Sequence, residues 1–231
     1  MNSVVARASR IASLASLALL VSGDARAQAY TAQTESLAPP SQLAAPVRDA
    51  LSAQAIRVSS PQGELCEIWL RKSIPVNATP DQGLGILYGQ LSVGELLGAI
   101  QFPSEVIDYR NQHIKPGVYT LRYGLQPVDG NHQGVSDYRD FLLLAPAAED
   151  TQPAGVAEKD LFDLSRQATG SKHPSVWSLV ASDGAPDSLP GTTHHEDSDT
   201  WVLYFRLPIG AAGAPVTMAL IVSGHAPESG T

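Results

Sequence analysis

The feature that most constrains the fold is a series of short apolar or alternating runs separated by Gly, Pro, Asn and Asp. In residues 117–125, Tyr119, Leu121 and Tyr123 share one face and Thr120 and Arg122 share the other, because side chains alternate along a strand. This pattern predicts a half-buried strand. We expect nine strands, over residues 55–59, 65–72, 85–91, 96–102, 117–125, 139–144, 176–180, 200–207 and 216–223.

Many short strands with turn residues between them favour a mainly β protein, built as an antiparallel two-sheet sandwich of the jelly-roll or immunoglobulin-like kind. One short helix is expected over residues 158–168, where Leu161, Leu164 and Ala168 share a face and Gly170 would end it. We expect a single domain over residues 53–224, preceded by a flexible linker over 30–52 and followed by a loose tail over 225–231.

The first 29 residues have the order of a secretory signal peptide. Arg7 and Arg10 precede an uncharged apolar run over residues 11–22, and small residues follow at Ala25, Ala27 and Ala29. This run is shorter than the ~20 residues that a membrane-spanning helix needs, so we expect cleavage rather than a stable membrane anchor. Cleavage is expected after Ala29, and cleavage after Ala27 fits the same rule. The sequence thus predicts a protein exported to the periplasm or the medium.

The chain is acidic, and its single cysteine limits its chemistry. Its formal net charge is −8, and removal of residues 1–29 makes it −10. Nucleic acids are not expected partners, because they are bound through clusters of Lys and Arg. Cys66 cannot form an intramolecular disulfide, and its apolar surroundings predict a place in the core.

Two polar stretches contain the residues most suited to binding. The first, residues 126–138, is long for a hairpin loop. The second, residues 194–199, precedes the strand that contains Trp201. The structural alternative, which the residue types favour, is that the first stretch is an ordinary turn and the second a solvated loop. The candidate ligand-binding residues are Asp129, Asn131, His132, Asp137, Arg122 and Arg139.

The sequence predicts no cofactor outright. If the two stretches met at one end of the fold, however, imidazoles and carboxylates would converge on a site able to bind a divalent metal. The candidate metal ligands are His132, His194, His195 and Glu196. Cross-strand ion pairs with Asp129, Asp137 or Asp140 are a structural alternative for the two arginines, Arg122 and Arg139.

One segment carries a family resemblance. The run from Lys115 to Leu144 contains Pro-Gly-Val-Tyr-Thr-Leu-Arg-Tyr-Gly-Leu-Gln-Pro-Val-Asp-Gly-Asn-His, and Glu-Ile-Trp-Leu-Arg occurs upstream at residues 67–71. Both resemble a family of exported bacterial proteins, a domain of unknown function. The resemblance implies no catalytic residues. The Pro-Gly-Val-Tyr-Thr-Leu part is also similar to secreted β-sandwich domains, which implies a β-rich fold.

No nucleophile elbow, phosphate loop or paired-cysteine motif occurs in the sequence. We therefore expect a non-enzymatic binding module for a small ligand, a glycan or a protein partner in the cell envelope. Two alternatives stay open. One is a metal-dependent hydrolase that uses Asp129 together with the four candidate metal ligands, and the other is a structural subunit of an envelope complex.

Overall fold

The computed structural model describes residues 29–128, 136–210 and 214–226. Their core is one ten-stranded antiparallel sheet in the order β1-β2-β3-β4-β7-β8-β9-β12-β11-β10, accompanied by a two-stranded β5-β6 sheet. The elements are β1 (Thr31–Ser36), α1 (Ala45–Ala50), β2 (Leu51–Ser60), β3 (Gly63–Arg71), β4 (Leu96–Phe102), β5 (Val106–Ile107), β6 (His113–Ile114), β7 (Gly117–Leu125), β8 (Asp140–Pro146), α2 (Glu158–Thr169), β9 (Trp177–Val180), β10 (Gly191–His195), β11 (Thr200–Leu207) and β12 (Val216–Ser223). Among these residues no helix is long and apolar enough to cross a membrane.

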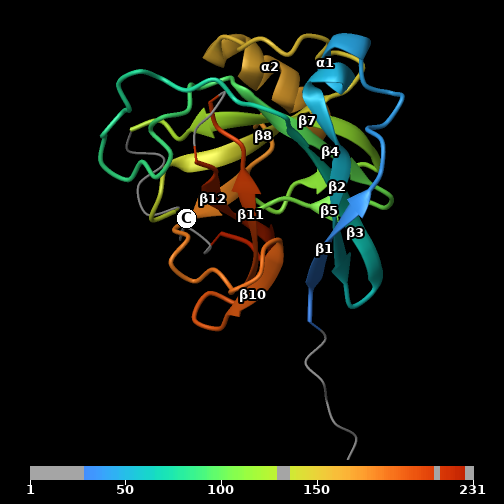
Figure 1. Cartoon of the computed structure of the whole chain (residues 1–231), viewed down its shortest axis with the longest axis vertical. Coiled ribbons are helices and arrows are strands. Elements are labelled where there is room, and N and C mark those ends of the chain that lie inside the picture. Colours follow the sequence, from blue (N-terminus) through green and yellow to red (C-terminus); the bar gives the residue numbers. More distant parts are fainter. Residues whose placement is uncertain (1–28, 129–135, 211–213, 227–231) are drawn as a thin grey trace, which may run out of the picture.

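The large sheet curves until it is nearly a barrel (Figure 1). β1 and β10 stand at the two ends of the strand order, yet they lie beside each other, and the hydroxyl of Thr192 donates a 2.6 Å hydrogen bond to the carbonyl of Tyr30. The mainly antiparallel β class is confirmed. The separation into two packed sheets is not confirmed, because β9 pairs with both β8 and β12 and so makes the hydrogen bonding continuous.

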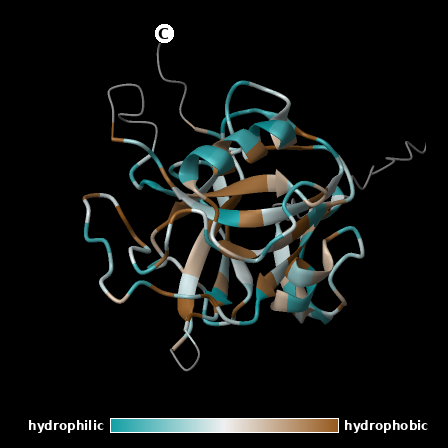
Figure 2. Ribbon diagram, turned by 90° about the horizontal axis from the view of Figure 1, so that it is seen from above, coloured by the Kyte–Doolittle hydropathy of each residue, from teal (hydrophilic) through white to brown (hydrophobic). Residues whose placement is uncertain are grey.

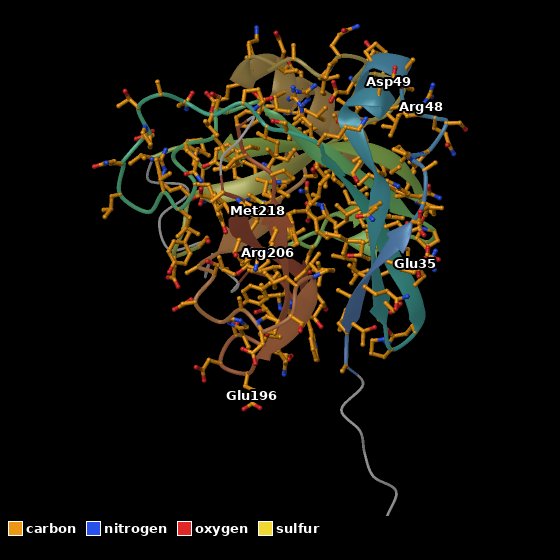
Figure 3. All side chains as sticks on the ribbon, in the orientation of Figure 1. Glu35, Arg48, Asp49, Glu196, Arg206 and Met218 are labelled. Carbon is orange, nitrogen blue, oxygen red and sulfur yellow. The ribbon has the colours of Figure 1, made fainter. Side chains whose placement is uncertain are left out.

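The main core fills the inside of this curved sheet. Alternate residues of the strands point inward, among them Cys66, Phe102, Trp177 and Met218, which are all buried. Figure 3 shows Met218 within the molecule, whereas Glu35 and Glu196 reach its periphery. The predicted place of Cys66 in the core is confirmed.

Both helices cover the outer face of the sheet and lie at the same end of the molecule in Figure 1. α1 packs against β2 through Val47, and α2 packs against β8 through Leu161. Their exposed turns are teal in Figure 2, whereas the strands that they cover contain more brown, hydrophobic residues. The predicted helix over residues 158–168 is confirmed as α2, and Gly170 ends it with the left-handed φ of 64° that favours glycine.

The prediction that β7 is half buried is wrong. Thr120 and Arg122 face outward but are fully buried, because the segment 147–156 covers them. Arg122 forms an ion pair with Asp150, and within the described residues it forms none with Asp137 or Asp140. Asp129 lies outside the described residues.

Two further expectations differ from the structure. Residues 85–91 form turns instead of a strand, because the carboxylate of Asp140 accepts the backbone N–H groups of Leu87 and Tyr88 that a neighbouring strand would otherwise bind. The segment 30–52, expected as a flexible linker, contains β1 and α1 and begins β2. Apart from Ala29, the expected signal peptide lies outside the described residues, as does the predicted tail beyond Ala226.

Candidate functional site

The strongest candidate site is a cleft of about 210 Å³ on the outer face of β8 and β9, beside α2. We call it the α2 cleft. Its lining comes from five segments of the chain, within residues 109–110, 126–127, 136–141, 162–166 and 172–178. The lining residues are Tyr109, Arg110, Gln126, Pro127, Ser136, Tyr138, Arg139, Asp140, Phe141, Phe162, Arg166, Lys172, His173, Pro174, Val176 and Ser178.

Local packing fixes the helical wall of the α2 cleft. Phe162 and Arg166 are four residues apart and therefore share the face of α2 that lines the cleft. On its buried side, the hydroxyl of Ser165 lies 3.0 Å from the hydroxyl of Ser175 and accepts the backbone N–H of Ser175, also at 3.0 Å. The Ser175 hydroxyl in turn accepts the N–H of Leu144 in β8 at 2.7 Å. These bonds hold α2 and the 171–176 segment at a fixed position on the sheet.

A buried carboxylate fixes the wall formed by Tyr109 and Arg110. Asp108 is 1% exposed, and it accepts the backbone N–H groups of Arg110, Gln112 and Val176 at 2.8–2.9 Å. Burial raises the pKa of Asp108, while these N–H bonds act in the opposite direction. The turn that presents Arg110 is thus tied to the start of β9.

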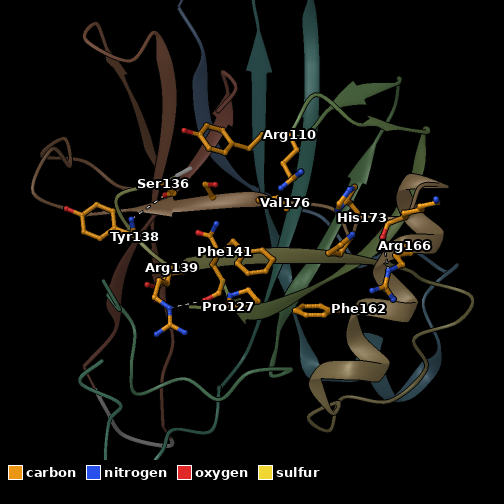
Figure 4. A pocket seen from close by; sticks show the side chains of 16 residues that line it. Arg110, Pro127, Ser136, Tyr138, Arg139, Phe141, Phe162, Arg166, His173 and Val176 are labelled. Carbon is orange, nitrogen blue, oxygen red and sulfur yellow. Dashed lines mark hydrogen bonds between the residues drawn. The ribbon is translucent and has the colours of Figure 1, made fainter. Parts of the chain in front are cut away.

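The floor of the α2 cleft is apolar and its rim is cationic. Figure 4 shows Phe141, Phe162 and Pro127 near the centre, with Arg110, His173 and Arg166 on one side and Tyr138 and Arg139 on the other. Phe141 is 7% exposed, and it belongs to the hydrophobic cluster that joins α2 to β8. An apolar group placed there would lose contact with water.

The cationic groups of the α2 cleft outnumber its carboxylates. Four cationic side chains line it, those of Arg110, Arg139, Arg166 and Lys172. Among the described residues, Asp140 is the one carboxylate in the lining, and it already accepts hydrogen bonds from Leu87, Tyr88 and the Tyr123 hydroxyl. In a chain of net charge −8, this cleft is a local region of positive charge.

The cationic groups differ in how firmly they are held. The Arg139 Nε donates to the carbonyl of Gln126 at 2.9 Å. Within the described residues its two Nη groups form no hydrogen bond or ion pair, so they can bind a ligand. Arg166 forms an ion pair with Asp163 and donates to the carbonyl of Lys172. Among the described residues, no hydrogen bond or ion pair involves the Arg110 side chain. Arg110 and Arg139 are therefore the groups best suited to bind an anion.

A second pocket of about 330 Å³ adjoins the α2 cleft, and we call it the His195 pocket. The two share Tyr109, Ser136 and Tyr138. The lining residues of the His195 pocket are Tyr109, Ser136, Asp137, Tyr138, Val180, Ala181, Asp183, His195, Ser198, Thr200 and Ile221. The two polar stretches predicted from the sequence thus meet here, since residues 136–138 and residues 195 and 198 line one pocket.

The structure brings together only part of the predicted ligand-binding set. Arg139 lines the α2 cleft and Asp137 lines the His195 pocket. Arg122 belongs to a buried structural ion pair away from both. The predicted residues Asp129, Asn131 and His132 lie outside the described residues.

Of the predicted metal ligands, His132 lies outside the described residues, and the other three do not converge. His194 and His195 are consecutive in β10, so their side chains point to opposite faces of the strand. The His194 ring stacks on Trp201 and lies 2.9 Å from an Asp199 carboxylate oxygen, whereas His195 Nε2 lies 2.7 Å from the Tyr204 hydroxyl. Glu196 is exposed in the turn after β10. In the described part of the chain, no group of three or more His, Cys, Asp or Glu side chains is placed to hold a metal ion.

Sequence reasoning missed most of the α2 cleft. The spacing of Phe162 and Arg166 on a predicted helix was the one available signal, and it did not show which side of the helix faces the sheet. Arg110, Lys172 and Phe141 belong to segments that become neighbours only in the folded chain.

Comparison with known proteins does not assign the chain to a family, since no family model, no curated protein and no solved structure matches it.

Proposed function

We propose that this protein is a non-catalytic binding protein, and that its α2 cleft takes a small organic anion with an apolar body. The observation that carries this proposal is the cationic rim above an aromatic floor, which the lining carboxylate does not neutralise. Guanidinium groups suit carboxylates because they can donate two parallel hydrogen bonds. Phe141 and Phe162 would bury the apolar part of the ligand.

The size of the α2 cleft restricts the ligand further. Pockets for drug-sized ligands measure about 300–1,000 Å³. A cleft of about 210 Å³ fits a smaller body, such as one aromatic ring with a short acidic chain.

Isothermal titration calorimetry with 3-phenylpropionate and the matched neutral 3-phenylpropionamide tests this proposal. We expect the carboxylate to bind at least tenfold more tightly, with an affinity that falls as NaCl is added. Arg110→Gln and Arg139→Gln should each weaken carboxylate binding about fivefold or more, because each removes a charged donor. Arg206→Gln is the matched control, since Arg206 is exposed on β11 and lines neither the α2 cleft nor the His195 pocket. Equal binding of acid and amide, or an equal loss in the control, contradicts the proposal.

Export belongs to the same proposal. It is supported by Arg7 and Arg10, the apolar run over residues 11–22 and the small residues that follow. N-terminal sequencing of protein released from the periplasm or the medium should begin at Tyr30, or at Gln28 for the alternative cleavage. Recovery only from the cytosol with Met1 retained contradicts it.

A further inference from the structure

The α2 cleft and the His195 pocket have opposite charge. The α2 cleft is lined by Arg110, Arg139, Arg166 and Lys172. The His195 pocket is lined by Asp137 and Asp183, and no Lys or Arg lines it among the described residues. Both carboxylates are exposed, and within the described chain neither takes part in an ion pair.

The charges of these two carboxylates act on Tyr109, which lines the His195 pocket, and on Tyr204, which contacts the lining residue His195. Burial raises the pKa of Tyr109, and the nearby charge of Asp137 raises it further. Burial likewise raises the pKa of Tyr204, whose hydroxyl binds His195, and the charge of Asp183 adds to this effect. A cationic group in this pocket would meet two carboxylates without a competing ion pair.

The geometry of β9 sets the distance between the α2 cleft and the His195 pocket. Ser178 lines the α2 cleft and Val180 lines the His195 pocket. They are two residues apart on the outward face of β9, which places them about 7 Å from each other. An extended dipeptide covers a similar length, since each residue spans about 3.3–3.6 Å. The two charged groups of a single free amino acid lie closer together than this.

We propose that the ligand is a short zwitterionic peptide, which places its carboxylate in the α2 cleft and its ammonium group in the His195 pocket. The aromatic floor of the α2 cleft would then receive an apolar side chain at the carboxyl end of the peptide. This inference rests on the proposed anion binding and adds the second charge and the length of the ligand.

Calorimetry with three related probes tests it. The probes are glycyl-phenylalanine, its N-acetyl derivative, which lacks the ammonium group, and its amide, which lacks the carboxylate. We expect glycyl-phenylalanine to bind most tightly, the N-acetyl derivative about fivefold to tenfold more weakly, and the amide more weakly still. Asp137→Asn with Asp183→Asn should weaken glycyl-phenylalanine by the same factor and leave the N-acetyl derivative unchanged.

The outcomes separate the two proposals. Asp187→Asn is the matched control, because Asp187 is exposed, follows Asp183 by four residues and does not line the His195 pocket, and it should change nothing. If the N-acetyl derivative binds as tightly as glycyl-phenylalanine, the zwitterion inference is wrong and anion binding stands. If the amide binds as tightly as glycyl-phenylalanine, or if neither carboxylate probe binds, anion binding itself is wrong.

Discussion

Replacement of Asp150 by Ala should be among the most destabilising single substitutions in this protein. Arg122 is fully buried, and all five of its N–H donors are used. Nε and Nη2 donate to the two oxygens of Asp150 at 2.6 and 2.7 Å. The remaining donors bind the carbonyls of Gly94, Ala154 and Gln152 at 2.6–2.9 Å. Removal of the carboxylate leaves a buried cation without its counter-charge.

The expected loss is about 3–5 kcal/mol of unfolding free energy, the range for breaking a buried ion pair from one side. For a domain of this size, that corresponds to a fall in melting temperature of about 6–20 °C. Urea unfolding with linear extrapolation measures it. The double variant Arg122→Leu with Asp150→Leu should lose less than Asp150→Ala alone, because it leaves no unpaired buried charge. A loss below about 1 kcal/mol for Asp150→Ala, or an additive double variant, would refute this reasoning.

Three further predictions concern single groups. Burial raises the pKa of the Cys66 thiol well above its usual range, so iodoacetamide should modify Cys66 only after the protein unfolds. Rapid labelling of the native protein would contradict this prediction. Burial raises the pKa of Tyr88 to about 12. The unfolded tyrosine ionises near pH 10, so between about pH 10 and 12 the folded state retains a proton that the unfolded state has lost. The urea midpoint should therefore decrease as the pH rises through this range, and it should decrease less steeply in Tyr88→Phe. Gly94→Ala should lower the unfolding free energy by about 3 kcal/mol or more in urea unfolding, because φ is +85° and the new Cβ would lie 1.8 Å from the Val156 carbonyl oxygen. Gly155→Ala is the control and should cause only a small loss, since a single atom lies near its Cβ, at 3.9 Å.

The sequence predicted strands where one face is apolar and the turns are marked. The bounds of β4, β7, β11 and β12 agree with the expected ranges, because alternation is a local property of the chain. β1 could not be recognised in this way, since its residues are small and polar and it is held by pairing with β2. The burial of Arg122 depends on a partner 28 residues away, which no local pattern reveals.

The candidate site shows the same contrast between features that are local in the sequence, which were predicted, and features that depend on packing, which were not. The loop around residues 126–138 was found by its length and polarity, and Asp137 and Arg139 do line the two pockets. His194 and His195 do not face a common site, because they are consecutive in β10, a segment that was expected to be a loop. Phe141 and Phe162 were not identified because their use as a floor depends on the packing of α2 over β8.

The contact between the two ends of the sheet has a consequence for how the chain reaches this structure. The Thr192 hydroxyl meets the Tyr30 carbonyl across 162 positions of sequence. Such distant pairings require a large loss of chain entropy before they are formed, and proteins rich in them fold slowly. During synthesis β1 must therefore wait for β10, and the sheet remains unclosed, and accessible to chaperones and proteases, until residue 192 arrives.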